Sequence, residues 1–142
     1  MNIQLTRFQE YAKNRLERIH PEWKNYLEDC IDENIRELVY IINSPANPDN
    51  KLYIVITCDD ITVKFAVQGS HEHYDIYCEG SEAERFEKAF NWAFEKYINP
   101  VLENKLVAVW HEGFMGGTLT SDPEGFLKMN PKITAKKIES WS

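Results

Sequence analysis

The chain has 142 residues, of which 43% are hydrophobic and 27% are charged. This length and composition are typical of one globular domain rather than of a disordered chain. With 23 acidic and 16 basic residues, the net charge at pH 7 is -7, which repels nucleic-acid phosphates and anionic membranes and attracts basic proteins. We therefore expect a single domain over residues 1–142, a basic protein partner, and neither nucleic-acid nor membrane binding.

The amino-terminal residues MNIQLTRFQEY contain no apolar run resembling a signal peptide, and no later stretch is long and apolar enough to span a bilayer. These features predict a cytoplasmic protein. Cys30, Cys58 and Cys78 lack the CxxC spacing of zinc sites, and an odd number does not match a secreted disulfide framework. We interpret them as reduced thiols buried in the core.

Two helices are predicted at the start of the chain. Residues 6–19 place apolar side chains at helical spacing, and Thr6 and Gln9 are suited to form a capping box. Pro21 interrupts this pattern and is well suited to the first position of a second helix. The apolar spacing extends that second helix over residues 21–43.

A β-hairpin is predicted next, because apolar residues alternate strictly on both sides of Asp59 and Asp60. If these two residues form the turn, one face of the hairpin pairs only apolar side chains. The predicted pairs are Cys58 with Ile61, Ile56 with Val63, Ile54 with Phe65, and Leu52 with Val67.

The remaining elements follow from similar patterns. A turn over residues 69–72 leads to a third strand that extends the apolar face with Tyr74, Ile76 and Cys78. Ser81 and Glu84 can cap a third helix, which ends or kinks near Pro100. A fourth strand over 106–110 could pair with the first or the third strand, and a short strand is expected over 118–120, before a tail without a clear pattern.

Together these elements predict an α+β fold. We expect a mostly antiparallel sheet of four to five strands with the helices packed mainly on one face. The expected order is helix, helix, three strands, helix, strand, short strand and tail.

The most enzyme-like cluster consists of His71, Glu72, His73 and Asp75, since imidazoles and carboxylates can bind metals or transfer protons. In the predicted turn His71 lies in the loop, while His73 and Asp75 share the polar face of the strand. No third ligand is identifiable, so a polar turn is the favoured interpretation and no metal site or cofactor is predicted.

His111 and Glu112 could instead form an acid/base pair beside the glycines of GFMGGT. Adjacent strand residues point to opposite faces, however, so the two converge poorly. The glycine stretch also lacks the GK[ST] ending of a phosphate-binding loop. A small enzyme or ligand-binding domain that uses His71, His73, His111 and Glu112 is therefore the alternative hypothesis, and no catalytic residue is assigned.

Acidic and aromatic side chains alternate on the predicted outer side of the second helix. Tyrosine supplies a large contact area with few rotatable bonds, and carboxylates can pair with a partner's lysines and arginines. The competing interpretation is a solvated face with two incidental tyrosines. The stripe comprises Glu22, Tyr26, Asp29, Glu33, Glu37 and Tyr40.

Trp92 lies away from the apolar side of the third helix and is the seventh candidate for partner binding. The carboxyl-terminal tail could cover it instead.

We therefore expect a non-enzymatic binding protein that masks a basic site on another protein. In size, acidity and absence of a catalytic motif the chain resembles immunity proteins that neutralise bacterial toxins. That resemblance implies occlusion, in which carboxylates cover the partner's cationic surface and aromatic side chains supply buried contact. A homodimer that hides the exposed aromatic side chains is a further alternative.

Overall fold

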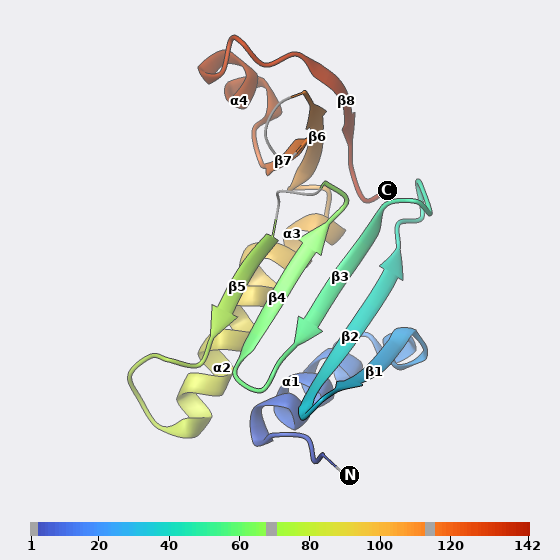
Figure 1. The fold of residues 1–142 in the computed structure, drawn as a ribbon. Helices are drawn as coiled ribbons and strands as arrows, with labels where there is room; N and C mark the ends of the chain where they lie inside the picture. Colours follow the sequence, from blue (N-terminus) through green and yellow to red (C-terminus); the bar gives the residue numbers. More distant parts are fainter. Residues whose placement is uncertain (1–2, 68–70, 113–115) are drawn as a thin grey trace.

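Figure 1 shows the computed structural model, which describes residues 3–67, 71–112 and 116–142. Helices and antiparallel strands occupy the chain in similar shares, so the predicted α+β class is confirmed. The elements are α1 (Arg7–Ile19), the 3₁₀ turn η1 (Pro21–Tyr26), β1 (Leu27–Asp32), β2 (Ile35–Asn43), β3 (Lys51–Ile56), β4 (Asp60–Phe65), β5 (His71–Asp75), α2 (Glu82–Ala93), the π-helical turn η2 (Phe94–Ile98), α3 (Asn99–Leu102), β6 (Val107–His111), β7 (Gly117–Thr120), α4 (Pro123–Met129) and β8 (Ala135–Glu139).

The larger sheet contains β1 to β5 in sequence order, and every neighbouring pair is antiparallel. Helices α1 and α2 lie against the same face of this sheet (Figure 1), as the sequence predicted. The core lies between this face and the helices, because alternate side chains of β2, β3 and β4 are buried there. Its largest fully buried side chains are Tyr40, Phe8, Phe65, Phe90, Leu16, Leu38, Leu52, Ile54, Ile56, Ile61 and Ile98. The opposite face carries no helix in the described part of the chain (Figure 1).

The predicted starts of the first and third helices are confirmed. At α1 the Gln9 backbone amide donates to the Thr6 hydroxyl at 3.1 Å, and the Thr6 amide donates to Gln9 Oε1 at 2.9 Å. At α2 the Glu84 amide donates to the Ser81 hydroxyl at 3.2 Å. These bonds satisfy amides that have no partner within the helix. The α2 helix continues through η2 and α3 and ends at Leu102, close to Pro100 as expected.

The helix predicted over residues 21–43 is wrong. Only the 3₁₀ turn η1 follows Pro21, and the rest of the segment forms the antiparallel pair β1 and β2. The apolar residues matched a helical period, but the stretch from Ile35 to Ile42 is rich in β-branched side chains, which favour strands. It also alternates, so Leu38, Tyr40 and Ile42 enter the core from one face of β2.

The β3–β4 hairpin is confirmed, but its predicted register is shifted by two residues. Ile56 lies opposite Ile61, Ile54 opposite Val63 and Leu52 opposite Phe65. Thr57 closes the turn, since its amide donates to the Asp60 carbonyl at 2.9 Å and its hydroxyl accepts from the Asp60 amide at 3.0 Å. The central turn residues are therefore Cys58 and Asp59. A shift of two keeps every side chain on its predicted face.

The predicted third strand is present as β5, although it begins earlier than expected. Tyr74 lies opposite Ile61 on the helix side of the sheet, as the alternation predicted. Ile76 and Cys78 follow the strand rather than forming part of it. The predicted turn over 69–72 lies largely outside the described residues, but His71 and Glu72 already belong to β5.

Neither predicted pairing of the fourth strand is correct. Strand β6 is the centre of a second antiparallel sheet in the order β7–β6–β8, and β8 comes from the tail. The two sheets meet where Trp141 packs against Phe65, with ring centroids 5.8 Å apart. Gly117 lies so close to Val67 that a Cβ atom there would approach the valine side chain to 2.4 Å. The predicted glycine turn over 113–118 falls partly outside the described residues.

The cysteines are all free, as expected, but the predicted burial is wrong. Cys30 and Cys58 are exposed, and Cys78 is half-buried. Cys30 lies on an edge strand and Cys58 at the tip of a turn, and neither position has a layer packed over it.

Candidate functional site

The six residues predicted to share one helical stripe lie on different elements and faces. Glu22 is in η1, Tyr26 ends it, Asp29 is in β1, Glu33 is in the connecting turn, and Glu37 and Tyr40 are in β2. The stripe as predicted is therefore wrong, because a strand sends successive side chains to opposite faces.

Tyr40 is fully buried in the core, so it cannot contact a partner. Its hydroxyl donates to Glu17 Oε2 at 3.1 Å, which ties β2 to α1. Burial, together with the Glu17 carboxylate, raises the pKa of Tyr40. Tyr40 is a structural residue rather than an exposed contact.

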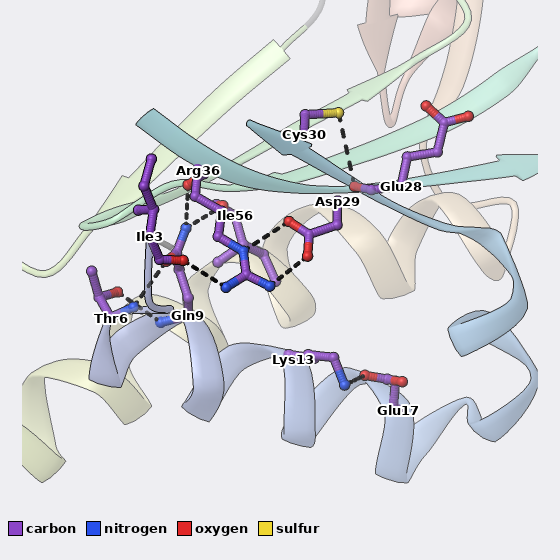
Figure 2. A network of polar contacts seen from close by, with 10 residues as sticks. All are labelled: Ile3, Thr6, Gln9, Lys13, Glu17, Glu28, Asp29, Cys30, Arg36 and Ile56. Atoms are coloured by element: carbon purple, nitrogen blue, oxygen red, sulfur yellow. Dashed lines mark hydrogen bonds and ion pairs between the residues drawn. The ribbon is translucent and has the colours of Figure 1, made fainter. Parts of the chain in front are cut away.

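Asp29 also has an internal role, shown in Figure 2. The Arg36 guanidinium donates to Asp29 through Nε–Oδ1 at 2.9 Å and Nη2–Oδ2 at 2.5 Å, and its Nη1 donates to the Ile3 carbonyl at 2.8 Å. The hydrogen bond from Arg36 lowers the pKa of the Asp29 carboxyl. The guanidinium therefore links β1, β2 and the segment before α1.

Gln9 supports the same corner from the core side. Its buried side-chain amide donates to the Arg36 carbonyl at 2.7 Å and to the Ile56 carbonyl at 3.3 Å (Figure 2). These carbonyls lie at the end of β3 and the start of β2, where ladder pairing ends. The capping residue of α1 thus also fixes the position of the hairpin.

The segment Tyr26–Glu37, which we call the acidic hairpin, carries five carboxylates and one guanidinium. Strand β1 is the edge of the sheet and is exposed along almost its whole length. In the described part of the chain, no basic side chain lies within 4 Å of the carboxylates of four of these acids. These four unpaired residues are Glu28, Asp32, Glu33 and Glu37.

Large apolar side chains stand among these carboxylates. Tyr26, Ile31 and Ile35 are 48%, 56% and 61% exposed. The register places Ile31 beside Arg36 on the helix side of the hairpin and Ile35 beside Asp32 on the opposite side, so the hairpin exposes apolar area on both faces. The acidic hairpin therefore combines negative charge with exposed apolar area. The sequence predicted this combination on a helix, whereas the structure places it on a β-hairpin.

A cleft of about 440 Å³ lies beside the acidic hairpin. Carboxylates dominate its charge, since Glu37, Asp59 and Asp60 line it and its cation, Arg36, is already bound to Asp29. Asp60 also accepts from the Thr57 hydroxyl at 2.8 Å, which holds this carboxylate at the turn. The remaining lining residues are Ile3, Gln4, Thr6, Gln9, Asn34, Ile35, Thr57 and Cys58. A cationic side chain would be attracted into such a cleft.

Trp92 occupies a separate surface on α2 and is half-buried. The ammonium groups of Lys88 and Lys96 lie 4.9 Å and 5.7 Å from the centre of its ring. The tail packs elsewhere, through Trp141 on Phe65. Trp92 is therefore accessible, and the surface hollow beside it is lined by Glu84, Glu87 and Glu95 as well as by Lys88.

The histidines of the alternative hypothesis are divided between the two sheets. His111 is buried in the smaller sheet, where Nε2 lies 3.0 Å from the Thr118 hydroxyl and Nδ1 lies 3.0 Å from the Glu112 carbonyl. The Glu112 side chain instead approaches Lys136 at 3.7 Å. His71 and His73 lie on β5 of the larger sheet. No group of three or more metal-ligating side chains occurs within residues 3–67, 71–112 and 116–142.

Sequence reasoning missed Glu28, Ile31, Asp32 and Ile35 as surface residues. Ile31 and Ile35 were counted in the buried stripe of the wrong helix. The signal that could have found them is the polar triplet Asp32-Glu33-Asn34 between two runs with strand-forming residues, which is a hairpin pattern. Glu33 has a positive φ of 49°, consistent with a tight turn there.

Searches of protein-family models, curated proteins and solved structures found no match to this chain. Among the helices of the described residues, none has the length and apolar character needed to cross a membrane.

Proposed function

We propose that this chain is a non-enzymatic binding protein that masks a basic site on another protein, in the manner of an immunity protein that neutralises a toxin. The observation that carries the proposal is the acidic hairpin, where unpaired carboxylates and exposed apolar side chains occur along the same edge of the sheet, beside an acidic cleft. The hairpin replaces the predicted helical stripe, and it keeps Tyr26, Glu33 and Glu37 of the predicted contact residues.

The positions of the side chains suggest a different role for each group within the proposed interface. Tyr26, Ile31 and Ile35 supply apolar area that a partner would bury. Asp32 and Glu33, near the tip, are exposed and unpaired, so they steer a cationic partner toward the hairpin. Asp29 and Tyr40 hold the hairpin in place and do not touch the partner.

Occlusion requires no covalent chemistry. A lysine or arginine of the partner would enter the cleft next to Glu37, Asp59 and Asp60. If the partner is a nuclease-like toxin whose active cleft is basic, filling that cleft blocks its substrate. The cytoplasm is the compartment we propose for this encounter.

The test is affinity capture of a partner from the source cell, followed by charge reversal. We expect a basic partner, and we expect Asp32→Lys with Glu33→Lys to weaken its binding by about tenfold or more, mainly through a slower association rate. Raising the salt concentration should weaken wild-type binding more than binding of this variant.

Asp49→Lys with Glu79→Lys is the matched control, because it makes the same change of charge at two exposed loop positions away from the hairpin. This control should bind within about twofold of wild type if the location of the charge matters. An acidic partner, or equal binding by the hairpin and control variants, would refute the proposal.

A further inference from the structure

The two histidines of β5 share one face of the larger sheet. His71 lies opposite Lys64, and His73 lies opposite Thr62. Tyr74, which points to the helix side, separates His73 from the next residue on that face, Asp75. The turn predicted from sequence would have kept His71 in a loop. The strand instead places both imidazoles two residues apart on the face away from the helices.

The rings are close enough to bind one ion together. Their centroids are 5.1 Å apart and their planes are nearly perpendicular, at 85°. Two imidazoles bound to one tetrahedral zinc ion, each through a nitrogen about 2.1 Å from the metal, have centroids about 5 Å apart. The spacing between the rings therefore allows a nitrogen of each imidazole to reach one ion after rotation of the side chains.

The environment of His73 supports the same assignment. Its Nδ1 lies 2.7 Å from the Thr62 hydroxyl, which orients the ring and leaves Nε2 for an ion. Histidines that bind metals usually have such a second hydrogen bond from the other ring nitrogen. His71 is exposed and has no hydrogen-bond partner within the described residues, so both of its nitrogens are accessible.

Charged side chains of both signs lie near the two histidines, so some would repel a bound cation and others would attract it. Lys64 lies on the same face, opposite His71, and its ammonium is 5.7 Å from the centre of the Tyr53 ring. Farther along that face, Asp60 and Asp75 lie opposite each other and supply negative charge. Open zinc sites usually have three protein ligands with water in the fourth position, whereas here two imidazoles would hold the ion and water would fill the remaining positions.

We propose that His71 and His73 together bind one zinc ion, through Nε2 of His73 and a ring nitrogen of His71. Imidazole is a ligand that suits zinc and copper. In each of the two rings, the nitrogen that binds the metal must be unprotonated. The two histidines lie on β5, at the opposite edge of the sheet from strand β1 of the acidic hairpin.

The test is calorimetric titration of the metal-free 142-residue chain with Zn²⁺ alone. We expect one equivalent to bind, and His71→Ala or His73→Ala to weaken that binding by about tenfold or more. Thr62→Val should weaken it by a smaller factor, since it removes the hydrogen bond that orients His73. With Cu²⁺ as the probe, electron paramagnetic resonance should show two coordinated nitrogens in wild type and one in either single variant.

His20→Ala is the matched control, because it removes a histidine that stacks on Trp23 away from β5. It should leave Zn²⁺ binding unchanged. Cys30→Ser and Cys58→Ser address binding by the two exposed thiols. Failure of wild type to bind Zn²⁺, loss of binding in the cysteine variants, or full binding by the His71→Ala, His73→Ala double variant would each overturn the proposal.

Discussion

Two hairpins of the larger sheet, β1–β2 and β3–β4, differ in how far their side chains are buried. In β3–β4 every second side chain is buried, and the apolar pairs face α1 and α2. In β1–β2 the edge strand β1 is exposed along nearly all its length, although it pairs with β2 over six residues. Pairing alone therefore does not decide burial. What differs is whether a helix covers the strand.

This difference indicates which hairpin is available for binding. Substitution of buried side chains on a covered strand reduces stability, whereas an exposed edge strand can carry charged and apolar side chains that remain accessible to another molecule. Charges on an edge also prevent uncontrolled pairing with other chains. The four predictions below test this contrast between the two hairpins.

The largest effect is expected in the covered hairpin. Ile54 is fully buried at the centre of β3. Ile54→Ala should lower the free energy of unfolding by about 2–5 kcal/mol, because it removes buried methyl groups and leaves a cavity. Chemical denaturation followed by circular dichroism measures this. A loss below about 1 kcal/mol would contradict the placement of Ile54 in the core.

Tyr40→Phe tests the point where the second hairpin joins the core. Loss of the hydrogen bond to Glu17 should reduce the free energy of unfolding by about 1–2 kcal/mol. Burial raises the pKa of Tyr40 and of Tyr97 in the folded protein. The unfolded chain therefore loses these phenol protons at a lower pH than the folded protein does. The contribution of the two tyrosines to the free energy of unfolding is fully present below about pH 10 and falls as the pH rises further.

The decrease in the free energy of unfolding at high pH provides a second test of the role of Tyr40. Unfolding experiments across this pH range should show a smaller decrease for Tyr40→Phe than for wild type, because one of the two buried phenols is absent. Tyr26→Phe changes an exposed tyrosine outside the core and is the matched substitution. An identical alkaline profile for wild type and Tyr40→Phe would show that Tyr40 does not contribute.

Arg36→Ala should loosen β1 while leaving β3–β4 intact. The guanidinium holds Asp29 and the Ile3 carbonyl, and it adds these side-chain bonds to an edge strand that pairs along one side, with β2. We expect faster hydrogen exchange at the amides of β1 and unchanged exchange at those of β3, because edge strands open locally before the core does. Lys24→Ala, an exposed cation outside this network, is the control. Equal exchange in β1 with and without Arg36 would show that the guanidinium does not hold the hairpin.

The smallest effect is expected for Ile31→Ala. This isoleucine is 56% exposed on β1, so its truncation should change the free energy of unfolding by less than about 0.5 kcal/mol. The same chemical change at Ile54 is the direct comparison. If Ile31→Ala cost as much as Ile54→Ala, β1 would be covered in solution and the acidic hairpin would not be free to bind.

Much of the fold could be predicted because local patterns were unambiguous. The capping residues Thr6 and Ser81 marked two helices, and the alternation around Asp59 marked the β3–β4 hairpin. The candidate site was harder, since Ile31, Ile35 and Val39 satisfy a helical spacing as well as a strand pattern. Only the pairing of β2 with β3 distinguishes a strand from a helix at these residues. The tail has too few apolar residues to predict β8, whose partner β6 is more than twenty residues away.

The sequence by itself determined the α+β class, the faces of the central strands and the acidity of the surface. These depend on composition and on periodicity, which are local properties. The tertiary structure alone decided which strands lie at the edges, which tyrosine is buried, and that His71 and His73 are neighbours on one face. Such outcomes depend on contacts between distant segments, and a side chain's exposure depends on what packs over it rather than on its own neighbours in the chain.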